Sequence, residues 1–166
     1  MERHERYRRN ALSYCIASAR LDAEETSEFI APISLCLAFA IELYLKCVLL
    51  KAGKTEEQLR WKPFGHDLWS MWNMPELAAK RNQGSRLALS CFQDLSRDES
   101  LTRVVPEPTT FERFLEDLSK LHTSESGMAL RYPTQMNRVP DSALMISVFE
   151  NLIRAEQLGE EIEAVD

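Results

Sequence analysis

The chain has little glycine and proline and few cysteines. Only 5 of its 166 residues are glycine and 7 are proline, which leaves few positions for the tight turns of an all-β sandwich. Its four cysteines are far apart, and none belongs to a Cys-x-x-Cys pair. A zinc site built on thiolates is therefore not expected, and no metal or cofactor is predicted. We expect reduced, buried thiols in a cytoplasmic protein. They are Cys15, Cys36, Cys47 and Cys91.

Excess positive charge and the common catalytic motifs are also absent. The formal net charge is −6, which argues against a protein that coats nucleic acid, because neutralising phosphates requires clustered lysine and arginine. Basic residues gather in 1–20 and acidic ones in 147–166. These runs indicate either solvated helix faces or, at the N-terminus, a small basic patch that faces RNA. There is no Gly-rich phosphate loop, no Gly-x-Ser-x-Gly elbow and no His-Glu-x-x-His pair.

One long apolar run does occur, over residues 29–50. It has the length of a bilayer crossing, but Glu42 and Lys46 interrupt it. Each of these charges would cost about 2.5–3.5 kcal/mol near the centre of a membrane. Residues 1–10 are too charged to form the apolar part of a signal peptide. We therefore predict a buried core helix and no association with a membrane.

Apolar residues recur at helical spacing along most of the chain, and no segment alternates for long enough to be a strand. The fold prediction is all-α: a single domain over residues 1–166, folded as an antiparallel bundle of five or six helices with two long central ones. Thr55 and Thr109 are each expected to open a helix with a capping box, and Asp67 to act as an N-cap. The main predicted helices are His4–Glu25, Pro32–Gly53, one opening at His66, Ser85–Leu95, Thr109–His122 and Asp141–Glu163.

The polar residues of the predicted core allow two interpretations. Glu42 and Lys46 are four residues apart, so they share one face of the helix. They either pair to set the register of the helix or form the wall of a cleft that binds phosphate or nucleotide. His66 either bonds a neighbouring helix or serves as an acid or base, because its ordinary pKa lies near neutrality.

A predicted loop late in the chain contains Arg131 and Tyr132. The planar guanidinium of Arg131 suits phosphate or carboxylate, and loops often contain functional residues. The alternative for Arg131 is a salt bridge to Glu42 or to an acid of the last helix. Trp61, Trp69 and Trp72 are expected in the core or in a dimer interface rather than as stacking platforms for bases.

Four segments, in this order, resemble the HEPN superfamily of prokaryotic helical domains. They are Ala40–Lys46, Lys51–Lys54, Gly65–Leu68 and Leu130–Pro133. The resemblance implies an antiparallel helical bundle that is often dimeric. It also implies a role among the RNases of toxin and defence systems, or as a partner of nucleotidyltransferases or antitoxins. Non-catalytic adaptors occur in the same superfamily.

Catalytic members of that superfamily have an arginine followed five to seven residues later by a histidine. Asn137 stands at this distance from Arg131, but an amide cannot exchange a proton near neutral pH. Arg60 and His66 match the spacing by number, but they belong to the earlier element of the resemblance. His122 lies nine residues after Arg113 and fits the motif poorly.

The leading hypothesis is therefore a non-catalytic helical module. It would be a homodimer and the interaction or substrate-binding component of a prokaryotic toxin–antitoxin, defence or nucleotidyltransferase-linked system, with RNA or a nucleotide as ligand. One alternative is a metal-independent endoribonuclease that uses His66 with Arg131 or Arg60. A second alternative is a purely structural dimerisation domain. The predicted ligand-binding residues are Glu42, Lys46, His66, Asp67, Arg131 and Tyr132.

Overall fold

The computed structural model describes residues 2–24, 27–61, 64–98, 105–123, 130 and 142–163. These residues form seven α-helices and three short 3-10 turns, with no strand among them. The all-helical prediction is confirmed. The predicted number of helices was low because the segment before Pro75 folds into two helices of only five residues each, α3 (Glu56–Arg60) and α4 (Leu68–Trp72).

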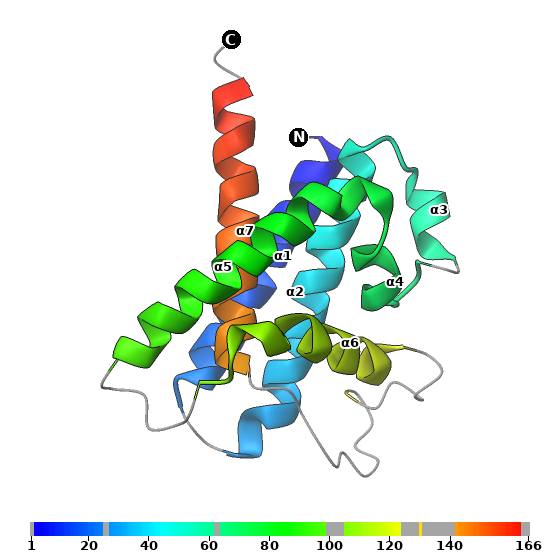
Figure 1. The fold of residues 1–166 in the computed structure, drawn as a ribbon. Coiled ribbons are helices and arrows are strands. Elements are labelled where there is room, and N and C mark those ends of the chain that lie inside the picture. Colours follow the sequence, from blue (N-terminus) through cyan, green and yellow to red (C-terminus); the bar gives the residue numbers. More distant parts are fainter. Residues whose placement is uncertain are drawn as a thin grey trace.

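Three long helices pack side by side: α1 (Arg3–Asp22), α2 (Ile30–Lys51) and α7 (Ser142–Glu163). α1 and α2 run in opposite directions as a helical hairpin, and α7 packs against both (Figure 1). More than half of the residues of α2 are buried, and most of the others are half-buried. A helix that is apolar nearly all round must be covered by others, which explains why α2 occupies the centre.

The predicted end of α2 is confirmed by its hydrogen bonds. Gly53 has a φ of 91°, a left-handed conformation that glycine adopts without steric cost. The backbone N–H of Gly53 donates to the carbonyl of Leu50, and that of Lys54 donates to the carbonyl of Leu49. This pair of bonds is the Schellman motif, which satisfies carbonyls that the helix end would otherwise leave unpaired.

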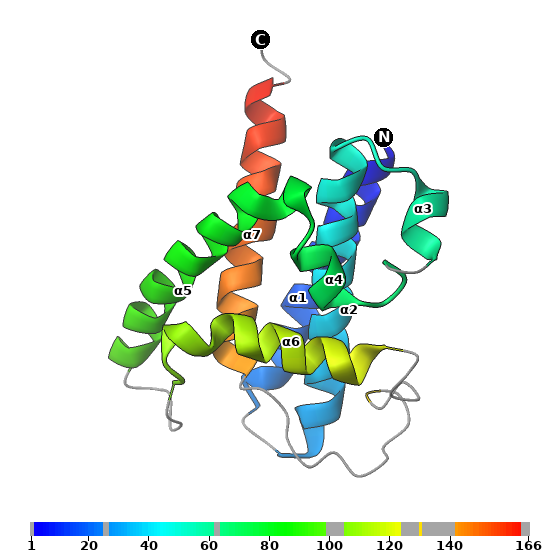
Figure 2. The same ribbon diagram turned by 45° about the vertical axis from the view of Figure 1, so that its right-hand side comes forward.

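Two further helices cover the bundle. α5 (Ala78–Arg97) packs along α7, and α6 (Phe111–His122) runs across α2 and α7 (Figure 2). Between them lies an aromatic cluster of Trp72, Phe111 and Phe149, whose ring centroids are 5.8–6.0 Å apart. Gly84 of α5 lies directly above this cluster. A Cβ atom at Gly84 would approach the Trp72 ring to 3.1 Å, so glycine permits the close packing of α5.

One predicted helix start is wrong. Thr109 and Glu112 do not form a capping box: a 3-10 turn (Pro108–Thr110) leads into α6, and the cap position, Thr110, makes no side-chain cap bond. The hydroxyl of Thr110 donates to the carbonyl of Glu107, and Glu112 accepts a bond of 3.4 Å from the indole of Trp72. By contrast, the capping box of Thr55 with Gln58 is confirmed.

A buried carboxylate on α7 joins three helices. Glu156 accepts hydrogen bonds from Lys51 of α2 at 2.8 Å and from Lys80 of α5. Burial alone would raise the pKa of Glu156, but the two lysines outweigh it and lower that pKa. The carboxylate is therefore ionised at neutral pH and links the end of α2 and the start of α5 to α7.

Most of the thiols and most of the long apolar run lie inside the fold. Cys15, Cys47 and Cys91 are buried as expected, whereas Cys36 is only half-buried, and none forms a disulfide. By length and composition α2 could cross a membrane, but 67% of its most apolar stretch is buried inside the fold. Such burial is typical of a core helix, which is what the sequence predicted for this run.

Candidate functional site

The site begins with two charged residues of the apolar helix α2. Glu42 and Lys46 lie one turn apart, and the ammonium Nζ of Lys46 donates to Glu42 Oε1 at 2.7 Å. Their side chains are 7% and 11% exposed. The predicted ion pair is confirmed, and its burial means that neither charge could be removed without leaving the other poorly compensated.

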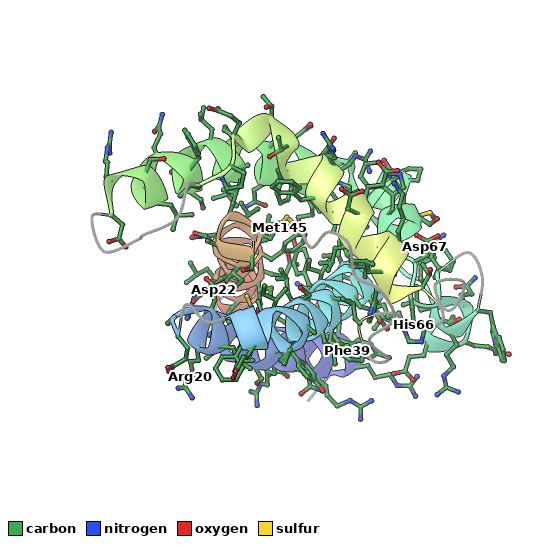
Figure 3. All side chains as sticks on the ribbon, turned by 90° about the horizontal axis from the view of Figure 1, so that it is seen from below. Arg20, Asp22, Phe39, His66, Asp67 and Met145 are labelled. Carbon is green, nitrogen blue, oxygen red and sulfur yellow. The ribbon has the colours of Figure 1, made fainter. Side chains whose placement is uncertain are left out.

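Two histidines from other segments complete the group. His66, in the loop before α4, places its Nδ1 2.9 Å from Glu42 Oε2. His122, the last residue of α6, places its Nε2 2.7 Å from the same oxygen. Figure 3 shows His66 beside the place where α2 and α6 come together. We call Glu42, Lys46, His66 and His122 the Glu42 cluster.

The carboxylate of the Glu42 cluster is ionised. Burial alone would raise the pKa of Glu42, but the hydrogen bond to His122, the charge of Lys46 and the bonds to Lys46 and His66 outweigh it and lower that pKa to about 2. Both carboxylate oxygens have partners, Oε1 the ammonium and Oε2 the two imidazoles. The cluster therefore joins α2, the loop before α4, and the end of α6.

Aromatic rings line the histidine side of the cluster. The His66 and His122 rings meet edge to face, with centroids 5.4 Å apart, and Phe39 packs in the same way on His122 at 5.2 Å. Tyr14 of α1 stacks on Phe39 at 5.5 Å. His122 is 3% exposed, whereas the His66 side chain is 37% exposed. Of the two histidines, His66 is therefore the one that solvent reaches most readily.

Asp67 acts as a helix cap and not as a member of the cluster. Its carboxylate accepts from the backbone N–H of Ser70 at 2.9 Å and from the Ser70 hydroxyl at 2.7 Å. The hydroxyl of Ser119 donates to Asp67 at 3.2 Å and accepts from the backbone N–H of Trp69 at 2.9 Å. The predicted N-cap is confirmed, and it also ties α4 to α6.

The structure thus brings together three of the six predicted ligand-binding residues: Glu42, Lys46 and His66. Arg131 and Tyr132 lie outside the described residues. Arg60 is exposed at the end of α3, and within the described part of the chain no hydrogen bond or ion pair joins it to His66. Of the three tryptophans, Trp72 is core, Trp69 is half-buried and Trp61 is 70% exposed.

His122 is the residue that reasoning from the sequence missed. Its distance from Arg113 does not fit the arginine–histidine motif, yet its position on α6 contains a signal. The buried positions of α6 include Phe111, Leu115, Leu118 and His122, which follow one another at helical spacing. A histidine on the apolar stripe of an amphipathic helix needs a buried polar partner. Glu42, the acid in the most apolar helix, is that partner.

The arrangement offers two kinds of chemistry. The contact of His66 with a carboxylate orients its imidazole, as in an acid–base pair. Glu42, His66 and His122 also present three donor atoms that all lie within 4.8 Å of one another. No family model, no curated protein and no solved structure matches the chain. Its function is therefore inferred from its own residues.

Proposed function

We propose that the protein is a non-catalytic helical module of the HEPN type. It acts in the cytoplasm, as a homodimer, as the interaction or substrate-binding component of a prokaryotic toxin–antitoxin, defence or nucleotidyltransferase-linked system. One observation supports a non-catalytic role above all: both oxygens of Glu42 are occupied, and one of its partners is His66, the candidate acid or base. Such a saturated group stabilises the fold and holds its shape.

The surroundings of His66 agree with this proposal. Cleavage of RNA without a metal needs a cation at the scissile phosphate together with a proton-transfer group. Lys46 supplies a cation within the Glu42 cluster, but its ammonium is bonded to Glu42 and its side chain is only 11% exposed. A lysine held in this way is poorly placed to bind the phosphate of a large substrate.

A second surface suits the recognition of a partner. Trp61 is 70% exposed and follows the exposed Arg60 at the end of α3. Arg3 and Arg6 of α1 approach Glu56 of α3 at 3.5 and 3.6 Å, with side chains 76% and 57% exposed. Tryptophan and arginine are the residues most often found at the centres of interfaces, and guanidinium groups bind phosphates in a planar, bidentate manner. These four residues, which we call the α1–α3 face, support an RNA or nucleotide ligand.

The test of the non-catalytic role is direct. Purified protein is incubated with single-stranded RNA in EDTA, beside the His66→Ala variant and a His4→Ala control. We expect no cleavage above the level of a buffer control in any of the three. Cleavage by the wild type and by His4→Ala that disappears in His66→Ala would overturn the proposal.

The binding role is tested on the α1–α3 face. Fluorescence anisotropy with a labelled single-stranded RNA compares the wild type with Trp61→Ala, and with Leu89→Ala as a matched control at another exposed apolar residue, 52% accessible. Because base–aromatic stacking contributes about 1–3 kcal/mol per base, Trp61→Ala should weaken binding by about tenfold. Equal affinity in all three proteins, or no binding by the wild type, would refute this role of the face.

A second candidate, a metal-independent endoribonuclease, is favoured by one observation. His66 is 37% exposed and its Nδ1 contacts an ionised carboxylate at 2.9 Å. This contact orients the imidazole as a general base would require. The RNA incubation separates the two candidates, since only the endoribonuclease predicts cleavage that depends on His66.

A further inference from the structure

Three side chains of the Glu42 cluster match the donor set of a transition-metal site. One carboxylate oxygen and two imidazole nitrogens, from Glu42, His66 and His122, lie within 4.8 Å of one another. We propose that these residues bind a divalent transition-metal ion of the Zn²⁺ class. This inference goes beyond the proposed function, because it assigns the cluster a ligand of its own.

The chemistry of the donors selects the class of ion. Imidazole nitrogen suits Zn²⁺, Co²⁺ and Ni²⁺, whereas Ca²⁺ and Mg²⁺ prefer sites made entirely of oxygen. Two histidines with one glutamate form a three-ligand set that leaves a fourth, open position for water. The site therefore differs from the closed, four-ligand thiolate sites that the spacing of the cysteines excludes.

The distances between the donor atoms, all within 4.8 Å, must change to admit an ion. The two histidines contact Glu42 Oε2 at 2.9 and 2.7 Å. Metal–ligand bonds of about 2.0–2.2 Å at tetrahedral angles separate neighbouring ligand atoms by about 3.3–3.5 Å. These two contacts must therefore lengthen by about 0.4–0.8 Å, and the two histidine nitrogens must settle at the same separation of about 3.3–3.5 Å. Rotation of the side chain of His66, which stands in a loop and is 37% exposed, can supply part of this change.

The groups around the three ligands would hold them in place. Lys46 remains bonded to Glu42 Oε1, which leaves Oε2 as the single oxygen directed at the histidines. Phe39 packs edge to face on His122 and restricts the rotation of its ring. Such outer contacts orient metal ligands and tune affinity. The exposed side of His66 provides the path of entry and the open coordination position.

The charge of the cluster predicts the strength of binding. The ammonium of Lys46 offsets the charge of Glu42, and the imidazoles add none when neutral, so the ion enters a group with little net negative charge. Binding should therefore be weaker than at thiolate sites, and it should require deprotonated imidazoles. It should also be strengthened by hydroxide or another small anion in the open position.

The test uses full-length protein freed of affinity tags and treated with chelator, to which Co²⁺ and then Zn²⁺ are added. Co²⁺ bound to two imidazoles and a carboxylate should give a visible d–d absorption band, which Zn²⁺ should bleach by displacement. The critical variant is His66→Ala, because His66 is half-exposed and its loss should leave the fold intact. The matched control is His4→Ala, since His4 is the remaining histidine and contacts Glu2, the residue before α1, at 3.3 Å.

We expect the cobalt band in the wild type and in His4→Ala, and a loss of at least about tenfold in affinity in His66→Ala. Zn²⁺ should raise the melting temperature of the first two proteins and not that of the third. No band in the wild type, or equal binding by His66→Ala, would overturn the metal site. The RNA incubation is carried out in EDTA, which removes metal ions, so its result tests the proposed function and not the metal site. The metal site is tested by the addition of Co²⁺ and Zn²⁺.

Discussion

The Glu42 cluster should contribute to the stability of the fold, and the substitution Glu42→Gln tests this contribution. The substitution keeps the shape of the side chain and removes its charge, so Lys46 and the two histidines lose a charge-assisted partner. In the native protein the pKa of Glu42 is about 2, against an ordinary value of 4.5. At about 1.4 kcal/mol per pH unit, this lowering corresponds to about 3 kcal/mol of stability. The free energy of unfolding of Glu42→Gln at pH 7 should be lower by about that amount.

The pH dependence gives the sign of the effect. The pKa of Glu42 is lower in the folded than in the unfolded protein, so its contribution is fully present above about pH 4.5 and is lost as the pH falls towards 2. The difference in stability between the wild type and Glu42→Gln should therefore stay near its full value from pH 7 to 5 and shrink below pH 4.5. Other acids, including Glu156, titrate in both proteins and cancel in the difference.

Urea denaturation followed by circular dichroism at pH 7, 5, 4 and 3, in EDTA, measures this difference. Glu116→Gln is the control, because the ion pair of Glu116 among the described residues is an exposed i,i+4 pair with Lys120, and such pairs contribute little. A difference for Glu42→Gln that stays constant from pH 7 to 3, or one no larger than that of the control, would refute the reasoning. Either outcome would mean that the cluster adds no net electrostatic stability.

Three further predictions concern packing and helix ends. Gly84→Ala should destabilise the protein by about 1 kcal/mol, because its Cβ would lie 3.1 Å from the buried Trp72 ring and overpacking of about 1–3 kcal/mol exceeds the gain of about 1 kcal/mol from helix propensity. Gly159→Ala, which meets nothing within 4 Å, has that gain without the clash and should stabilise the protein by about 0.5–1 kcal/mol. Thermal denaturation of the pair checks both signs. Asp67→Ala should lower the free energy of unfolding in urea by about 1–2 kcal/mol through loss of the cap, and Asp67→Asn should recover most of it. Glu156→Gln should lower the free energy of unfolding at pH 7 by about 1–3 kcal/mol, because it weakens two lysine contacts. This loss of stability should diminish in acid, because the pKa of Glu156 is lowered in the folded protein. An equal loss at pH 3 would contradict the prediction.

Much of the fold follows from local signals. The apolar character of α2, its end at Gly53, the capping box at Thr55 and the cap at Asp67 were all readable from the sequence. The three helix-end signals rest on interactions among residues at most five apart, and the energies of these interactions depend little on the rest of the chain. The predicted box at Thr109 shows the limit of such signals. There a 3-10 turn over Pro108–Thr110 replaces the expected cap, and the indole of Trp72, distant in sequence, engages Glu112.

The chain by itself determined that the molecule is helical, that α2 is central, and that Glu42 and Lys46 share one face of that helix. Only the tertiary structure decided that His66 and His122 meet on the same oxygen of Glu42, 24 and 80 residues away along the chain. It also decided that Glu156 collects lysines from two other helices. The physical reason is that a buried charge needs a partner, which can be expected from the sequence. Which residue becomes that partner depends on how the helices pack, and this packing depends on the whole core.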